Sequence, residues 1–148
     1  MEGQGYNKGV PARESLDEKM RYILDTCILI DYLRGEPSVY DILVRDDAVK
    51  LSMSTITVME LMLGALNKRE VDYIQKAFKI IEVIYISENI SKTAEDLIIR
   101  YSKSHSLQID DALIAATAIE TGEKLIMYNV SDFRYIPGVQ LYKFDAAD

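Results

Sequence analysis

Short apolar runs alternate along the chain with longer segments in which apolar residues recur every three or four positions. Short apolar runs predict buried β-strands, and the longer periodic segments predict helices that pack one face against a core. The expected strands cover residues 21–24, 49–53, 83–86, 124–128 and 139–144. The expected helices cover residues 27–35, 37–46, 55–66, 69–82, 90–105 and 109–122. This order predicts a three-layer α/β/α domain with a mainly parallel central sheet.

Glycine and proline mark the ends of several expected helices. Gly35 and Gly122 follow helical patterns and are expected to end them, and Pro37 is expected to open the second helix. The helix over 55–66 is apolar nearly all round, and the run 83–86 predicts a buried strand. In parallel sheets of this kind, ligands bind beyond the carboxyl ends of the strands, where the strand order reverses.

The hydrophobic pattern begins only near Met20. Residues 1–19 carry glycines and polar residues without periodicity, so they predict a flexible N-terminal tail, either native or vector-derived. Residues 20–148 predict one folded domain. With 148 residues in all and 49% hydrophobic residues, the chain is long enough to bury a core without disulfide bonds.

Composition excludes several classes of protein. A single cysteine, Cys27, and a single histidine, His105, exclude zinc ribbons, zinc fingers and CxxC redox chemistry. No apolar run approaches the length of a membrane span, and the N-terminus lacks the order of a signal peptide. We therefore expect a cytoplasmic protein in a reducing compartment, with no membrane partner.

The net charge of −7 argues against a broadly basic surface for nucleic acid. A site that binds phosphates through metal ions has the opposite requirement, because it needs clustered carboxylates while the metal supplies the positive charge. The charge of the chain is therefore compatible with a protein that does not bind nucleic acid and with one that binds its phosphates through metal ions.

Four carboxylates lack a local basic partner. Asp25 and Asp132 lie at or just beyond the ends of expected strands, and Glu60 and Asp111 lie on the most apolar expected helices. No lysine or arginine occurs three or four positions from Glu60 or Asp111. Taken singly, each of these acids is also explained as an exposed residue or a helix cap; Asp110, for example, lies beside Asp111 where a helix begins.

Other acids have a simpler explanation. Asp72 with Lys76, and Asp96 with Arg100, have the i,i+4 spacing of ordinary surface ion pairs. Asp31 is expected to face either the rim of the pocket or solvent on the first helix, and solvent is the favoured position.

Convergence of the four unpaired carboxylates would imply a metal ion, because like charges raise one another's pKa unless a cation lies among them. Oxygen ligands without histidine or cysteine favour Mg²⁺ or Mn²⁺. Such an ion lowers the pKa of a bound water and stabilises a departing oxygen. From these residues alone, the expected chemistry is metal-assisted hydrolysis of a phosphodiester or a phosphomonoester.

The order of four motifs resembles the PIN-domain nucleases, and most closely the small VapC-type toxins of toxin-antitoxin pairs. The motifs are LDTCILIDYLRG, TVMELMLGA, DALIAATAI and NVSDF, and the resemblance covers residues 20 to about 145. It implies a Mg²⁺- or Mn²⁺-dependent endoribonuclease that acts on RNA. It also implies a homodimer that is neutralised by a cognate antitoxin protein, whose tail reaches the acidic pocket.

The resemblance also implies roles for individual residues. By position in the motifs, the catalytic and metal-binding acids are Asp25, Glu60, Asp111 and Asp132. Asn129 matches a polar residue that assists the last acid, and Thr26 matches the hydroxyl that follows the first.

Other side chains are candidates for contacts with RNA. Arg34 is a candidate contact to phosphates, as are Lys50 and Arg134. Tyrosines such as Tyr32, Tyr40 and Tyr73 are candidates either for stacking on bases or for packing. His105 is expected to be a loop residue and not a general base.

The sequence departs from the family pattern at two positions. Met127 occupies a position where the family often has threonine or serine, which removes one possible contact to phosphate or metal. Asp110 adds a carboxylate beside Asp111; Asp111 is the better match because it directly precedes ALIAA.

Two alternatives to the nuclease stay open. The first is a catalytically silent domain of this fold that binds RNA or protein. The second is a Mg²⁺-dependent phosphatase of another α/β family. A phosphatase with an aspartyl-phosphate intermediate would carry a DxD motif, but Cys27 occupies the position two residues after Asp25.

Overall fold

A computed structural model describes residues 21–37, 39, 41 and 50–144. Along the chain the described elements are β1 (Arg21–Leu24), α1 (Thr26–Leu33), β2 (Lys50–Ser54), α3 (Thr55–Leu63), α4 (Lys68–Ala77), β3 (Glu82–Ile84), α5 (Glu88–Tyr101), α6 (Ile109–Thr121), β4 (Lys124–Met127), the short 3₁₀ helix η2 (Val130–Asp132) and β5 (Leu141–Lys143). The tail predicted over 1–19 lies outside the described residues. So does most of the helix predicted over 37–46, of which Pro37, Val39 and Asp41 are described and helical.

The five strands form one sheet in the order β3-β2-β1-β4-β5, and every pair is parallel. Strand β1 is central, with Ile23 opposite Ser52 of β2 on one side and Leu125 of β4 on the other. The strand order reverses between β1 and β4. The predicted parallel sheet is therefore confirmed, and its switch point lies where Asp25 ends β1.

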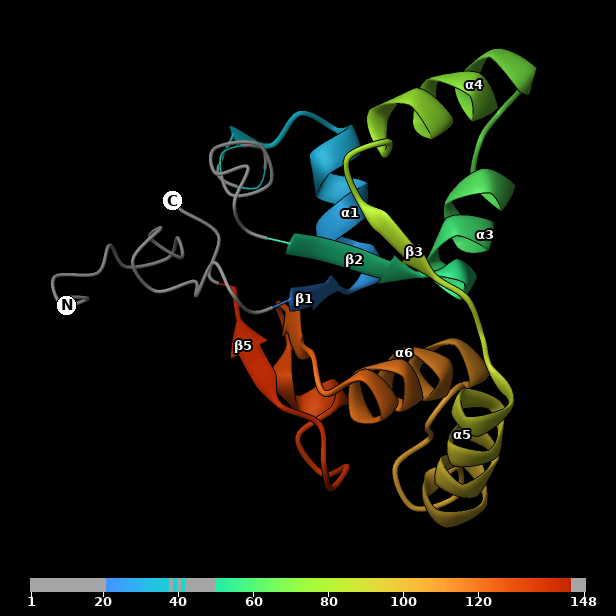
Figure 1. The fold of residues 1–148 in the computed structure, drawn as a ribbon, viewed down its shortest axis with the longest axis vertical. Helices are drawn as coiled ribbons and strands as arrows, with labels where there is room; N and C mark the ends of the chain where they lie inside the picture. The colour runs from blue at the N-terminus through green and yellow to red at the C-terminus, as the bar shows by residue number, and fades with distance from the viewer. Residues whose placement is uncertain (1–20, 38, 40, 42–49, 145–148) are drawn as a thin grey trace, which may run out of the picture.

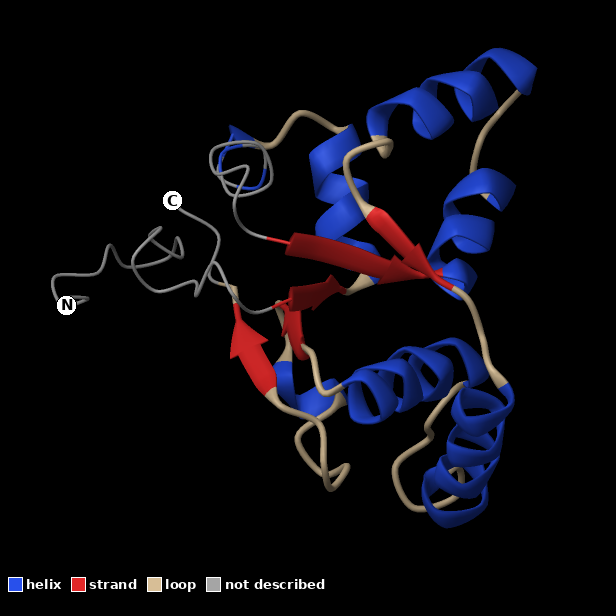
Figure 2. Ribbon diagram, viewed as in Figure 1, coloured by secondary structure: helices blue, strands red, loops and turns tan. Residues whose placement is uncertain are grey.

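Helices cover both faces of the sheet (Figure 1 and Figure 2). Helices α1, α3 and α4 lie on one face, and α5 and α6 lie on the other. Successive residues of β1 divide between the two cores, because side chains of a strand point alternately to opposite faces. Tyr22 and Leu24 join the first core and Ile23 joins the second. The predicted three-layer α/β/α architecture is confirmed.

Local sequence accounts for the helix ends. Gly35 and Gly122 have φ angles of 78° and 74°, in the left-handed region that glycine adopts without a Cβ penalty. The side chains of Ser54, Asn67 and Ser87 each accept a hydrogen bond from a backbone N–H in the first turn of α3, α4 and α5. The predicted stops at the two glycines are confirmed.

Two local predictions are wrong. The run 83–86 forms only a short strand, β3, that is partly exposed, and Tyr85 beyond it is 73% exposed. The reason is that β3 lies at the edge of the sheet and pairs only with β2. Asp72 pairs with Lys68 at 3.4 Å, one turn earlier than the predicted Lys76. The predicted pair of Asp96 with Arg100 forms at 2.9 Å.

Within the described part of the chain, no helix combines the length and the hydrophobicity required to cross a bilayer.

Candidate active site

Four segments deliver the predicted acids to the switch point of the sheet. Asp25 ends β1 and is the N-cap residue of α1, and Glu60 lies in the second half of α3. Asp111 lies in the first turn of α6, and Asp132 ends η2, which follows β4. Residues far apart in the sequence thus meet because parallel strands end at the same edge.

Asp25 is the most buried of these carboxylates, at 8% exposure. Its pKa is raised from 3.8 to about 6, and burial is the largest cause. A hydrogen bond with the backbone of Thr26 opposes the rise, and the negative charges of Asp132, Glu60 and Asp110 contribute to it. Asp25 therefore lies within electrostatic reach of acids from three other elements.

Glu60 and Asp111 show the same behaviour. The pKa of each carboxylate is raised to about 7, and burial is the largest cause of the rise in both. A hydrogen bond with Asp110 contributes next for Glu60, and the charge of Asp110 contributes next for Asp111. Asp25 and Asp132 also act on Asp111. Among the described residues, no basic group is one of the charges that shift these three pKa values.

A buried acid elsewhere in the molecule provides a contrast. Glu123 is 6% exposed, but it accepts a hydrogen bond from Ser52 Oγ at 2.5 Å and lies 3.9 Å from the Arg21 guanidinium. Arg21 also pairs with Glu82. Within the part of the chain that the structure describes, the carboxylates at the switch point have no such compensation from a basic side chain. Their mutual repulsion therefore calls for a cation from outside this set of residues.

The acids offer carboxylate oxygens, which fit a hard divalent ion. Cys27 also lies within electrostatic reach of the cluster, because burial and the charges of Asp25 and Asp111 raise the pKa of its thiol. Within residues 21–37, 39, 41 and 50–144, no three side chains of His, Cys, Asp or Glu are grouped closely enough to hold a metal ion together. Mg²⁺ is usually held by one or two carboxylates and keeps several waters. The arrangement therefore suits a water-rich site better than a closed cage.

Two hydroxyl groups orient Glu60. Thr26 Oγ1 donates to Glu60 Oε1 at 2.9 Å and lies 3.0 Å from Thr57 Oγ1. Thr57 is completely buried one turn before Glu60 on α3. The hydroxyl of Thr26, which the sequence motif singled out, thus links the start of α1 to the acid on α3. No pattern in the sequence indicated a role for Thr57.

Asn129 organises the segment that carries Asp132. Its Oδ1 accepts hydrogen bonds from the Ser131 backbone N–H at 3.1 Å and from Ser131 Oγ at 2.7 Å. Its Nδ2 lies 3.5 Å from Asp132 Oδ1, which is a weak contact. Both Asn129 and Asp132 are exposed, whereas Met127 is fully buried in the core beneath them.

Asp110 and Asp111 are both part of the acidic cluster, and neither is the N-cap of α6. Gln108 occupies the cap position without a side-chain cap bond. Asp110 Oδ1 accepts a hydrogen bond from the Asp111 backbone N–H at 2.8 Å. Asp110 faces Glu60, while Asp111 is influenced by Asp25 and Asp132.

Asp31 does not simply face solvent, contrary to expectation. Its Oδ2 accepts a hydrogen bond from Tyr128 Oη at 2.6 Å, and its side chain is only 31% exposed. Arg34 lies 3.8 Å from the other oxygen of Asp31. Because Tyr128 lies between β4 and Asn129, this bond ties α1 to the segment that carries Asp132. Nothing in the sequence indicated the pairing of Asp31 with Tyr128.

We expect Tyr128→Phe to lower the free energy of unfolding by about 1–2 kcal/mol, because it leaves a half-buried carboxylate without its hydroxyl donor. Urea unfolding in the presence of EDTA measures this change. In the Asp31→Ala background, which has no side-chain acceptor, the further substitution Tyr128→Phe should be nearly neutral. A fully additive double variant would show that the two side chains do not interact.

The other candidate RNA contacts differ in position. Arg34, Lys50 and Arg134 are exposed, and Arg34 makes the ion pair with Asp31. Lys50 begins β2 opposite Arg21, at the amino edge of the sheet, so the structure does not bring it to the acids. Tyr32 packs against Phe78, with 5.6 Å between ring centroids. Tyr40 lies outside the described residues.

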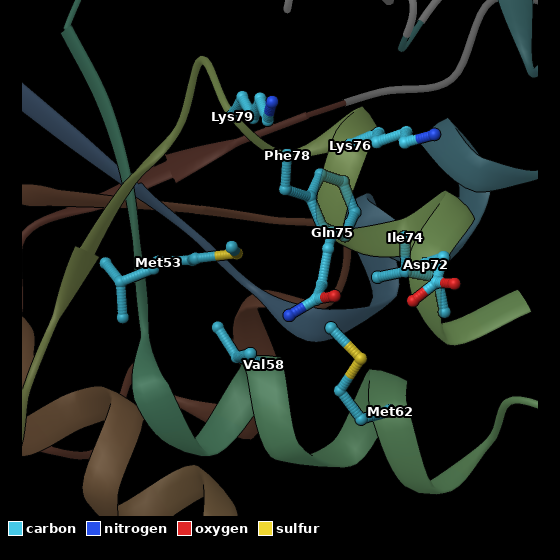
Figure 3. A pocket seen from close by; sticks show the side chains of 10 residues that line it. Met53, Val58, Met62, Asp72, Ile74, Gln75, Lys76, Phe78 and Lys79 are labelled. Carbon is cyan, nitrogen blue, oxygen red and sulfur yellow. The ribbon is translucent and has the colours of Figure 1, made fainter. Parts of the chain in front are cut away.

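Two pockets adjoin helix α3. One, of about 580 Å³, is lined mainly by apolar side chains from β2, α3 and α4, and Figure 3 shows Met53, Val58 and Phe78 around it. It contains none of the four acids. The other, of about 610 Å³, lies between α1, α3 and α4 and includes both Arg34 and Glu60. Of these two pockets, the second therefore touches the acidic cluster.

This fold with acids at its switch point matches one known class. A sequence model of the PIN domain matches residues 22–139, so the chain belongs to the PIN domain family. The predicted resemblance is thereby confirmed.

Two relatives indicate the type of PIN domain to which this chain is similar. The chain is 32% identical over 122 residues to the protein named Ribonuclease VapC19 of Mycobacterium tuberculosis, covering 80% of this chain and 96% of that protein. It is 31% identical to Ribonuclease VapC1 of Rickettsia felis, covering 87% of this chain and 100% of that protein.

Solved structures give the same result. A toxin-antitoxin complex from Klebsiella pneumoniae is similar, with a TM-score of 0.69 and 30% identity over 85% of this chain and 99% of that chain. VapBC2 from Rickettsia felis, bound to a DNA fragment from its promoter, has a TM-score of 0.73 and 25% identity over 85% of this chain and 100% of that chain. The chain is therefore a PIN domain of the VapC ribonuclease type.

The electrostatics of the site predict an unusual effect of removing a charge. Because the pKa of Asp111 is higher in the folded protein than in the unfolded chain, ionisation of this group costs stability as pH rises from 3.8 through about 7. We expect Asp111→Asn to stabilise the metal-free protein by about 1 kcal/mol at about pH 8, less than the full shift implies because solvent screens the group.

Thermal unfolding with EDTA tests this expectation at about pH 8 and at about pH 4, where most of the difference should vanish because Asp111 is then largely protonated. A clear loss of stability at both pH values would assign Asp111 a structural role instead.

Proposed function

We propose that this protein is a Mg²⁺- or Mn²⁺-dependent endoribonuclease, a toxin that hydrolyses RNA phosphodiester bonds. The observation that carries the proposal is the group of three acids with raised pKa values, Asp25, Glu60 and Asp111, that meet at the switch point without a basic partner among the described residues. A cluster of carboxylates without a basic partner destabilises the fold, so its presence favours a site that binds a cation and, through the cation, a phosphate.

Asp25, Glu60, Asp111 and Asp132 would hold the ion. When bound, it supplies a water of lowered pKa and offsets negative charge on the phosphate. The chain's own residues position the groups around it: Thr26 donates a hydrogen bond that fixes the Glu60 carboxylate, and Asn129 shapes the turn that presents Asp132. No general base is needed from His105, because a water of lowered pKa loses its proton without one.

The test is cleavage of single-stranded RNA. With Mg²⁺ or Mn²⁺ we expect fragments that disappear when EDTA is added and return when the metal is restored in excess. Mapping the ends of the fragments on whole-cell RNA would also identify the target. Cleavage that persists in EDTA would contradict the metal-dependent mechanism, and binding of RNA without cleavage would favour the silent module.

We further propose that a cognate antitoxin occupies the pocket of about 610 Å³ between α1, α3 and α4. Apolar residues such as Leu33, Leu61 and Ala65 line it, and the carboxylate of Glu60 offers an acidic end point for a basic side chain. Tyr73 lies at this pocket and is 59% exposed. We expect Tyr73→Glu to weaken inhibition by the antitoxin while RNA cleavage continues; unchanged inhibition would place the antitoxin elsewhere.

Self-association is a separate part of the proposal. Met59 and Leu63 are 47% and 87% exposed and lie one helical turn apart on α3. Exposed apolar side chains on one helix face support a homodimer contact there. Light scattering coupled to gel filtration should give twice the monomer mass for the native chain and the monomer mass for Leu63→Glu.

A further inference from the structure

Three aromatic rings are grouped beside the acidic cluster. The His105 and Tyr135 rings are stacked, with centroids 4.0 Å apart and planes 10° from parallel. Tyr101 meets both rings edge-on, at 5.1 Å from Tyr135 and 5.6 Å from His105. The group joins the end of α5, the loop between α5 and α6, and the loop after η2.

The backbone holds these rings in place. The His105 backbone N–H donates to Tyr101 O at 2.9 Å, and Ser106 has a φ of 57°, an uncommon value for a residue with a Cβ. Leu107 beyond it is buried, as are Phe133 and Ile136 on the two sides of Tyr135. The loop is thus anchored before and after the stack, which lowers the entropy cost of binding a further ring.

One face of the stack is open. His105 is exposed, and its aromatic neighbours among the described residues are Tyr135 and Tyr101. The His105 Nδ1 lies 2.8 Å from Ser104 Oγ, a hydrogen bond made at the ring edge and not on the ring face. Tyr135 is half-buried, and its pKa is raised by burial, by the charges of Asp111 and Asp132, and by Tyr101. The closed end of the stack therefore lies near the acids and the open end faces solvent.

The position suits a strand of RNA better than it suits general surface packing. An acidic protein with a net charge of −7 gains little affinity from its overall charge, so contacts to bases matter more. Aromatic rings stack on unpaired bases of any sequence. Lys103 and Arg134, which flank the stack in sequence, are exposed and form no ion pair within the described ranges, so both are free to bind phosphates.

We propose that His105 and Tyr135 form a stacking platform for an unpaired nucleobase of the RNA substrate, next to the nucleotide whose phosphate reaches the acids. This inference rests on the proposed ribonuclease function. The base extends the existing stack on the open face of His105, and Tyr101 supports the pair from its edge. The platform fixes which phosphate reaches the acidic cluster, and His105 acts through its ring face without transferring a proton.

The test combines protein variants with RNA that lacks single bases. Short single-stranded RNAs of one sequence, each with one abasic position, are cleaved in Mn²⁺ by the native protein, His105→Ala, His105→Phe and Tyr85→Ala. For the native protein, one abasic position near the cleavage site should lower kcat/KM by about 5- to 150-fold, the range typical of one stacked base. Circular dichroism confirms that each variant is folded.

The expected pattern is specific to stacking. His105→Ala should cleave the intact RNA about 5- to 150-fold less efficiently, and the same abasic position should cost it almost nothing further. His105→Phe should cleave the intact RNA nearly as efficiently as the native protein, and the abasic position should again lower its efficiency. The reason is that phenylalanine keeps an aromatic ring without the imidazole nitrogens. Tyr85→Ala, which removes an exposed tyrosine just beyond β3 that lines neither pocket, should keep the native profile.

Two failures are distinguishable. If the native protein cleaves no RNA with any divalent metal, the proposed function is wrong and this inference falls with it. If the native protein cleaves RNA but His105→Ala keeps the full penalty at every abasic position, or Tyr85→Ala removes it, the platform is wrong and the ribonuclease stands. Failure of His105→Phe to restore cleavage would also contradict stacking, since it would assign the effect to the imidazole nitrogens.

Discussion

Replacing Asp25 by asparagine is expected to lower the rate of RNA cleavage by more than about a hundredfold. Residues that only hydrogen-bond to a metal ligand typically contribute about 10- to 100-fold, and a ligand itself should contribute more. The amide side chain would keep the shape of the carboxylate but lose the charge that attracts the ion. Asp25 is the most buried of the four acids, at 8% exposure, and the charges of three other acids influence it. Initial rates with fluorescent RNA measure the effect.

A matched control separates charge at the site from charge in general. Asp96→Asn removes one negative charge from a surface ion pair with Arg100 on α5, so it should leave the rate nearly unchanged. Native rates from Asp25→Asn would mean that the nuclease activity comes from another site or from a contaminant.

The second large effect concerns pH. Asp25, Glu60 and Asp111 have pKa values of about 6, about 7 and about 7 in the metal-free fold, so a fall in pH through this range protonates groups that must be ionised to bind metal. Mn²⁺ affinity should therefore weaken at least tenfold or so for each pH unit below about 7.

Calorimetric titration of the protein with Mn²⁺ at several pH values measures this dependence. Asp111→Asn, which cannot release that proton, should bind more weakly at high pH and show a shallower dependence. Affinity that does not change with pH would indicate that the ion binds elsewhere, for example at exposed acids whose protons are already lost.

The alternation of strands and helices was readable in the sequence because amphipathic helices such as α4 and α5 alternate with short apolar runs such as β1. Their ends were predictable where glycine supplies the left-handed conformation, at Gly35 and Gly122. The edge position of β3 was not predictable, because strand order depends on which elements pair across the whole chain. For the same reason, Val83 and Ile84 read as buried although they are only half-buried.

The acids of the site could be proposed from the sequence, because Glu60 and Asp111 interrupt apolar helices without a local basic partner. The side chains that orient the site could not. Thr57 and Tyr128 act through contacts with Thr26 and Asp31, from which they are separated by long stretches of sequence. Such pairs follow from the packing of α1 against α3 and β4, which no local pattern encodes.

The central claim is that acids from β1, α3, α6 and η2 form one site for a divalent ion. Anomalous diffraction from crystals soaked in Mn²⁺ tests it most directly, because it locates the ion without reference to activity. We predict an anomalous peak at the carboxylates of Asp25 and Asp111, with waters completing the shell and with Glu60 and Asp132 nearby. A structure in which Mn²⁺ occupies other acids while these four carboxylates carry no peak would contradict the account.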